Sequence, residues 1–189
     1  KVAFRNLLKY KTQNIISIIG LAVGLLCFCI CMYCSRFVET TNHFKCFDYI
    51  LDTVNEPLTE DYIKKLHSLL KSGTSSEHNP IAPVGRYKVL QNEVGQIATA
   101  DVDRTEDEML ALMIGYGLKE NKNLAYLTSF HAQFEQIHPF ADGNGRVGRL
   151  ILYKECLKEG ITPFIVDDLN KASYYSALEA FQINDERQA

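Results

Sequence analysis

The sequence predicts a mainly α-helical domain that follows one transmembrane helix. Three observations support this fold class. A stretch of about 20 uncharged, largely apolar residues lies near the N-terminus, which is enough to cross a bilayer. Several later segments repeat apolar residues at helical spacing, and a single pair of short extended runs predicts one small β-hairpin. We therefore divide the chain into a head, residues 1–40, and a body, residues 41–189.

The overall composition excludes several classes of protein. The 189 residues are 47% hydrophobic and 23% charged, with 11 Gly and 5 Pro, which argues against a disordered, collagen-like or low-complexity chain. The formal net charge of −3 argues against a general nucleic-acid-binding protein. The charge is uneven, because the head has five basic residues and one acidic residue, whereas the body has 15 basic and 22 acidic residues.

The apolar stretch of the head runs from Ile15 to Cys34 and contains no charged side chain. A buried core helix and a signal peptide are the alternatives to a membrane span, but a core helix should carry a polar face and a signal peptide a small-residue cleavage site. Four basic residues precede the stretch and Arg36 follows it, so the positive-inside tendency places the N-terminus in the cytoplasm and the body on the opposite side. We expect a single-pass membrane protein.

The segment FRNLLKYKTQNIISIIGLAVGLL resembles the start of bacterial ABC-transporter permeases. This resemblance covers about the first 40 residues and includes no catalytic motif, and it implies a bacterial membrane protein. A fused gene would also explain it, and the body would then be cytoplasmic if the head is not native to it. The chain starts at Lys1 rather than Met, so we expect it to begin inside a longer product or to have been trimmed.

The body contains five predicted helices and one predicted hairpin. Thr59 is the expected N-cap of the first helix, and Thr105 with Glu108 forms a capping box at the second. Two short extended runs on either side of residues 91–93 predict the hairpin. The helices are predicted from apolar spacing and helix-ending residues over 58–71, 105–117, 122–137, 144–159 and 171–183.

Residues 138–149, HPFADGNGRVGR, carry the chemistry, beginning with a helix start suited to anions. The glycines of residues 143–145 let backbone N–H groups approach an anion closely, and the helix dipole adds partial positive charge there. Arg146 and Arg149 are i, i+3 neighbours, so both guanidinium groups emerge on one side of the helix, where each can bind phosphate oxygens. A plain turn followed by two solvated arginines is the alternative.

The same segment supplies a metal ligand and a base. Asp142 offers oxygen ligands of the kind that Mg²⁺ prefers, and His138 is a titratable group one loop away. Taken alone, each of these residues is more often structural, and Phe140 most simply packs inward. Together with the anion site, they are the parts that phosphoryl or nucleotidyl transfer requires.

The segment matches the Fic family motif H-x-F-x-(D/E)-G-N-G-R-x-x-R at every defined position, and the chain resembles this family over about residues 42–185. The resemblance implies a helical bundle of Fic fold with a β-hairpin flap. It implies protein AMPylation, in which AMP passes from ATP to a Ser, Thr or Tyr hydroxyl of a target protein and pyrophosphate is released. ATP as substrate, Mg²⁺ and a target protein are thus expected.

By this resemblance His138 is the general base that deprotonates the target hydroxyl, and Asp142 holds Mg²⁺ at the α and β phosphates. Gly145 favours AMP transfer, because Doc-type members, which phosphorylate, have a Lys there. The resemblance further implies an anion hole, two arginine clamps, a tyrosine pair beside adenine and a flap over the nucleotide. These nucleotide-binding residues are Asp142, Gly143, Asn144, Gly145, Arg146, Arg149, Tyr174, Tyr175, Val94 and Gly95.

The chain departs from the family in its regulation. Many members carry an inhibitory helix with (S/T)-x-x-x-E-(G/N), whose Glu pairs with the last motif arginine, and no such motif is found here. Either intrinsic inhibition is lacking, or a separate inhibitor protein or a segment beyond residue 189 supplies it. A homodimer is a further expectation. The alternatives to an active enzyme are an inert Fic remnant and a permease-type membrane component with a fused Fic tail.

Overall fold

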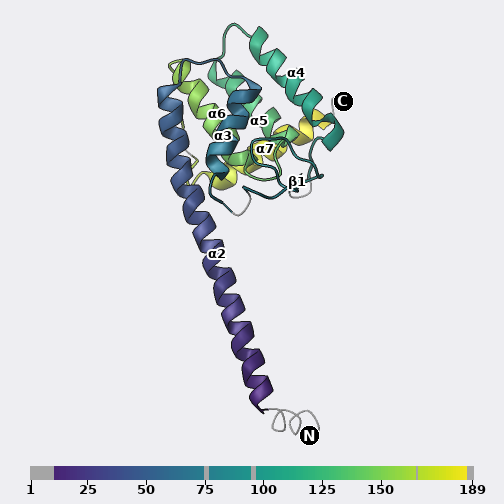
Figure 1. The fold of residues 1–189 in the computed structure, drawn as a ribbon. Helices are drawn as coiled ribbons and strands as arrows, with labels where there is room; N and C mark the ends of the chain where they lie inside the picture. Colours follow the sequence, from purple (N-terminus) through teal and green to yellow (C-terminus); the bar gives the residue numbers. More distant parts are fainter. Residues whose placement is uncertain (1–10, 75–76, 95–96, 165, 187–189) are drawn as a thin grey trace.

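The structure is a computed structural model, and it describes residues 11–74, 77–94, 97–164 and 166–186. The described part is mainly helical, as predicted, and Figure 1 shows one long helix that carries a bundle of shorter ones. Its helices are α2 (Lys11–Asp52), α3 (Glu60–Lys71), η1 (Val102–Arg104), α4 (Thr105–Leu118), α5 (Leu124–Ile137), α6 (Asn144–Lys158) and α7 (Lys171–Glu186).

Helix α2 has two parts with different environments. Its N-terminal part projects from the bundle as a rod (Figure 1), contains the predicted membrane stretch and is long and apolar enough to cross a membrane. The described side chains of that stretch are exposed rather than buried in the bundle, so it is not a core helix. The C-terminal part packs on the body, where Asn42, Cys46 and Ile50 are buried. The predicted boundary at residue 40 therefore falls inside one continuous helix.

Helix α3 runs antiparallel to the packed part of α2. Near the point where α2 leaves the bundle, the Asn42 side chain donates hydrogen bonds to the carbonyl oxygens of Leu70 (3.2 Å) and Ser72 (2.5 Å). At the opposite end of the pair, the hydroxyls of Thr53 and Tyr62 lie 2.7 Å apart. The C-terminus of α3 is thus fixed beside the base of the rod.

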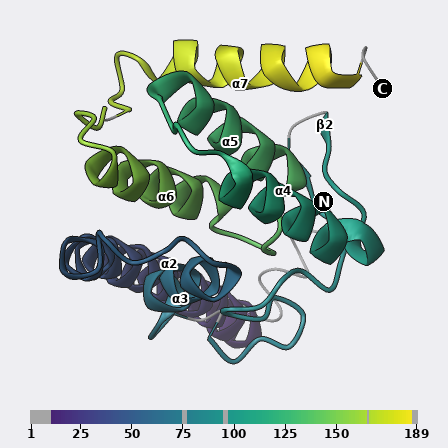
Figure 2. The same cartoon turned by 90° about the horizontal axis from the view of Figure 1, so that it is seen from above.

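The core lies where α5 and α6 pack against each other, with α3 against α6, α4 against α5 and α7 lying across α5 (Figure 2). Large side chains that fill it, including Phe134 and Phe140, are fully buried. The helix start predicted at Thr59 is confirmed, because its hydroxyl accepts from Tyr62 N at 3.1 Å. The N-cap predicted at Thr105 is wrong: a 3₁₀ turn precedes it, and its hydroxyl donates back to the Asp101 carbonyl.

Two short strands, β1 (Glu93–Val94) and β2 (Ile97–Ala98), pair antiparallel. The turn that the sequence predicted at residues 91–93 is placed too early. Asn92 is tied to the body instead, because its side-chain amide donates to the Phe140 carbonyl at 2.9 Å and its own carbonyl accepts from the Thr99 hydroxyl at 2.8 Å. Gly95 lies outside the described residues.

Candidate active site

His138 lies at the C-terminal end of α5 in a left-handed conformation (φ 51°, ψ 59°), which turns the chain out of the helix. Its Nδ1 is 3.2 Å from the carbonyl oxygen of Glu135. Because a carbonyl only accepts, Nδ1 carries the proton and Nε2 presents a lone pair. Burial lowers the pKa of His138 and the charge of Lys88 adds to this, against the opposing effect of the Glu135 hydrogen bond. The imidazole is therefore neutral near pH 7, as a general base requires.

The loop after His138 is held by a residue outside the motif. The His67 ring on α3 stacks on Phe140, with ring centroids 4.0 Å apart. Its Nδ1 accepts from Gly85 N at 2.9 Å, so its Nε2 is the protonated nitrogen and donates to the Asp142 carbonyl at 3.0 Å. Burial lowers the pKa of His67 to about 4, so the imidazole stays neutral near pH 7. Phe140 is fully buried, as the sequence predicted.

Asn144 closes the same loop from the other side. Its side-chain oxygen accepts from Phe140 N at 2.8 Å, and its side-chain nitrogen donates to the Phe140 carbonyl at 2.7 Å. Gly143 precedes α6 with φ 90°, and the first helical hydrogen bond runs from Val147 N to the Gly143 carbonyl at 3.0 Å. The side chain of Asn144 is thus committed to the loop, so residues 143–145 can offer an anion their backbone N–H groups.

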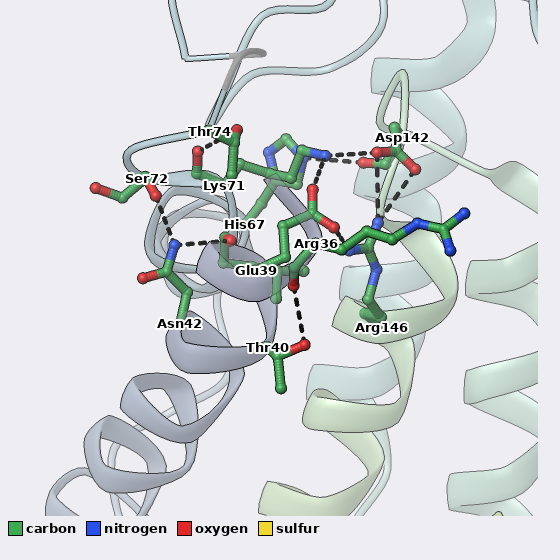
Figure 3. Close-up of polar contacts among 11 residues, drawn as sticks. Arg36, Glu39, Thr40, Asn42, His67, Lys71, Ser72, Thr74, Asp142 and Arg146 are labelled. Carbon is green, nitrogen blue, oxygen red and sulfur yellow. Dashed lines mark hydrogen bonds and ion pairs between the residues drawn. The ribbon is translucent and has the colours of Figure 1, made fainter. Parts of the chain in front are cut away.

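Asp142 and Arg146 belong to a four-residue ion cluster that also includes Glu39 and Lys71 (Figure 3). The ammonium of Lys71 is 2.5 Å from Glu39 Oε1 and 2.5 Å from Asp142 Oδ2. The guanidinium of Arg146 contacts the other Glu39 oxygen and lies 3.2 Å from Asp142 Oδ1. Burial alone would raise the pKa of Asp142, but its hydrogen bond and charge contact with Lys71, together with Arg146, lower it. Two cations and two carboxylates therefore neutralise one another.

Three residues of this site were not predicted from the sequence: Glu39, His67 and Lys71. For Glu39 a signal existed, because it is the only acidic residue of the head and Ser35-x-x-x-Glu39 has the spacing of the inhibitory pattern, with Thr40 in place of Gly or Asn. A carboxylate of this chain therefore does pair with a motif arginine. Its partner is Arg146, the first of the two, rather than the last.

The second motif arginine, Arg149, lies beside α7. Its guanidinium carbon is 6.0 Å from the centre of the Tyr174 ring, and the Tyr174 hydroxyl is 2.7 Å from His131 Nε2. Tyr175 packs edge-on against Tyr174 at 5.3 Å. The structure thus brings the predicted arginine and tyrosine pair together. A Cβ at Gly145 would lie 3.3 Å from Arg149 Nη1, so the glycine leaves room for the arginine.

The positions of the predicted flap residues relative to the motif are not described, because Gly95 and the side chain of Val94 lie outside the described part of the chain. Among the described residues, no three His, Cys, Asp or Glu side chains gather in a metal-binding group. The side chain of Asp142 is 60% exposed.

A glycine-rich helix start with adjoining cations and a neutral histidine forms a candidate site for phosphate chemistry on a helical bundle. The Fic/DOC family profile matches residues 57–156, which is more than half of the chain. The chain belongs to the Fic/DOC family.

Relatives and solved structures agree with this assignment. Protein adenylyltransferase fic-1 of Caenorhabditis elegans is 37% identical over 57 residues, 30% of this chain and 11% of that protein. Protein adenylyltransferase Fic of Aedes aegypti is 34% identical over 62 residues, which are 33% of this chain and 12% of that protein. A Fic domain-containing signaling protein from Bacteroides thetaiotaomicron superposes with a TM-score of 0.68 at 24% identity, covering 77% of this chain and 57% of that one, which shows the fold.

The alignments with these two relatives span only 11% and 12% of their lengths. None of the comparisons supports the resemblance of residues 1–40 to a permease, which stays a prediction.

Proposed function

We propose that this chain is a protein adenylyltransferase that transfers AMP from ATP to a Ser, Thr or Tyr hydroxyl of a target protein and releases pyrophosphate. The observation that carries the proposal is the neutral His138, with a free Nε2 lone pair, at the same loop as the glycine-rich start of α6. Relatives named as adenylyltransferases support it at the level of the family.

In the proposed reaction, His138 Nε2 accepts the proton of the target hydroxyl. The hydroxyl oxygen forms a bond to the α-phosphorus of ATP while the bond from that phosphorus to the pyrophosphate oxygen breaks. The left-handed turn at His138 and its hydrogen bond to the Glu135 carbonyl orient the ring, so the base is positioned before the nucleotide binds.

The phosphates are proposed to bind at the start of α6. The backbone N–H groups there and the guanidinium of Arg146 face the same loop, and Arg149 is proposed to reach the γ-phosphate. Asp142 fits Mg²⁺, because Mg²⁺ is commonly held by one or two protein carboxylates together with substrate phosphates, and this carboxylate is largely exposed. When bound, Mg²⁺ would neutralise charge on the phosphates.

Tyr174 and Tyr175 are proposed to border the adenine. Their position supports this, because Tyr174 lies beside the motif residue Arg149 and Tyr175 packs against Tyr174. The β1–β2 pair is proposed as the flap, with Val94 and Gly95 covering the nucleotide. An edge of that pair would align the backbone of the target by strand addition.

We also propose that α2 anchors the chain in a membrane as a single span. Support comes from its length, composition and exposed apolar stretch. The charge bias places the body opposite the cytoplasm, whereas a head foreign to the body would leave the body in the cytoplasm, where ATP is supplied. Protease digestion of right-side-out and inverted vesicles decides between the two sides.

The test uses the full chain in detergent with ATP labelled at the α-phosphate, Mg²⁺ and a host lysate, beside His138→Ala. Label on the chain or on a lysate protein that disappears in the variant would support AMP transfer, because the base acts in the transition state. Full labelling by the variant would refute the role of His138. ATP labelled at the γ-phosphate controls for kinase chemistry. A folded chain that binds ATP but transfers nothing would point to a missing activator or a different donor. A chain that transfers nothing and that ATP–Mg²⁺ does not stabilise against heat would favour the inert remnant.

A further inference from the structure

One carboxylate in the ion cluster is held by cations from two different helices. Lys71, the last residue of α3, contacts one oxygen of Glu39 at 2.5 Å, and Arg146, in the first turn of α6, contacts the other (Figure 3). Both cations also contact Asp142. The two side chains therefore form a cradle that binds one oxyanion through two of its oxygens, and Glu39 is the oxyanion that fills it in this structure.

The burial of Lys71 means that the cradle requires an anion. Its side chain is 3% exposed, and it forms ion pairs with Glu39 and Asp142. A buried ammonium that loses one of its counter-charges is strongly destabilised. If Glu39 leaves, an anion of similar shape is favoured to replace it, and the cradle lies beside Asp142 at the start of α6, where the phosphates are proposed to bind.

We propose that Lys71 is a nucleotide-binding residue. Together with Arg146 it holds a phosphate group of the nucleotide, which displaces the Glu39 carboxylate from the cradle. This inference rests on the proposed function and extends it, because Lys71 lies on α3, 71 residues before Asp142 and outside the motif.

A coupling to α2 follows from the position of Glu39. The residue lies on the same continuous helix as the apolar stretch, one turn before Asn42, which fixes α2 to the end of α3. A phosphate and the Glu39 carboxylate compete for the same cations, so nucleotide binding and the seating of this part of α2 oppose each other. By linkage, a change that loosens α2 here tightens nucleotide binding by the same factor.

The test measures the affinity of the full chain in detergent for ATP and for adenosine, which lacks phosphate, by calorimetry with Mg²⁺ present. Glu39→Gln is expected to tighten ATP binding about tenfold, because it removes the competing carboxylate charge. Adding Lys71→Met to that variant is expected to weaken ATP binding about tenfold or more and to leave adenosine binding unchanged.

The result that would overturn the proposal is equally specific. If Lys71 only supports Glu39, Lys71→Met alone will tighten ATP binding as Glu39→Gln does, and the double variant will bind ATP as tightly as Glu39→Gln. Lys64→Met is the matched control, because Lys64 lies two turns earlier on α3 and pairs with Glu60 at 3.3 Å. It is expected to change neither affinity.

A second measurement needs no change at Lys71 and so covers the case in which that variant fails to fold. In the Glu39→Gln chain, ATP is expected to protect the Lys71 amine from an acylating reagent, read by mass spectrometry, and adenosine is not. Equal labelling with and without ATP would refute the contact. Measuring ATP binding and AMP transfer separately distinguishes the two proposals. If ATP binding depends on Lys71 but no AMP is transferred, only the proposed function is refuted. If AMP is transferred but ATP binding does not depend on Lys71, only this inference is refuted.

Discussion

Glu135 gives the sharpest test of the packing between α5 and α6. Its side chain is 8% exposed, and its Oε1 has no hydrogen-bond partner among the described residues. Burial raises the pKa of Glu135 to about 7 from an ordinary value of 4.5, against the opposing charge of Arg149 on α6. Tyr174 on α7 and His131 on α5 are the other titratable groups of this region. The carboxyl is thus favoured in its neutral form.

The magnitude follows from the pKa difference between the folded and unfolded states. Each unit is worth about 1.4 kcal/mol, so the shift corresponds to about 3 kcal/mol. Between pH 4.5 and about 7 the folded state binds more protons than the unfolded state. The free energy of unfolding therefore falls as pH rises through this window. The contribution of the neutral carboxyl to stability is fully present at low pH and is lost above the folded-state pKa.

Glu135→Gln removes the titration and keeps the shape of the side chain. We expect the free energy of unfolding of the variant, relative to that of the native chain, to rise by about 2–3 kcal/mol between about pH 5 and about pH 8. His131 titrates in the opposite sense, because burial lowers its pKa to about 4, but it is present in both chains and largely cancels in the difference. The assay is urea unfolding of both full chains in detergent, followed by near-UV circular dichroism of tyrosine, since the chain has no Trp. A difference that stays constant with pH, or shrinks as pH rises, would refute the reasoning.

Two further predictions concern the motif itself. Asn144→Ala removes both hydrogen bonds to the Phe140 backbone (2.8 and 2.7 Å) and leaves the buried Phe140 N–H unpaired, whereas the Phe140 carbonyl keeps its bond from Asn92, so we expect it to lower the free energy of unfolding by about 1–3 kcal/mol. Urea unfolding measures this, and a loss below about 0.5 kcal/mol would show that the loop does not depend on the amide. Gly145→Lys places a side chain where a Cβ already lies 3.3 Å from Arg149 Nη1, so we expect AMP transfer to slow about tenfold or more in a chain that still folds. An unchanged rate would show that the space at the helix start is not needed.

The features that the sequence predicted well are those encoded by neighbouring residues. The start of α3 at Thr59 depends on a hydrogen bond to Tyr62, three residues away, and the helices of the body follow from apolar spacing within each segment. The motif segment is contiguous, so its glycines, arginines, acid and histidine could be identified together, and with them the family. The inward packing of Phe140 was likewise predicted and is confirmed.

Two predictions were wrong because the residues concerned make other hydrogen bonds than the local pattern indicated. The turn predicted at residues 91–93 is displaced, because Asn92 bonds to Phe140, 48 residues away. The cap predicted at Thr105 is replaced by a 3₁₀ turn, in which its hydroxyl bonds to the Asp101 carbonyl. A long-range contact thus displaced the predicted turn, whereas a neighbouring 3₁₀ turn displaced the predicted cap.

The sequence by itself determined the helical class, the motif and the family, because each is set by residues that lie within a few turns of one another. Only the tertiary structure decided which groups surround the motif. Glu39 reaches Arg146 across 107 residues, and Lys71 reaches Asp142 across 71. No spacing rule links residues so far apart, since α2 and α3 must first pack antiparallel and deliver both side chains to the start of α6. The charges that set the electrostatics of the site are therefore a product of that packing.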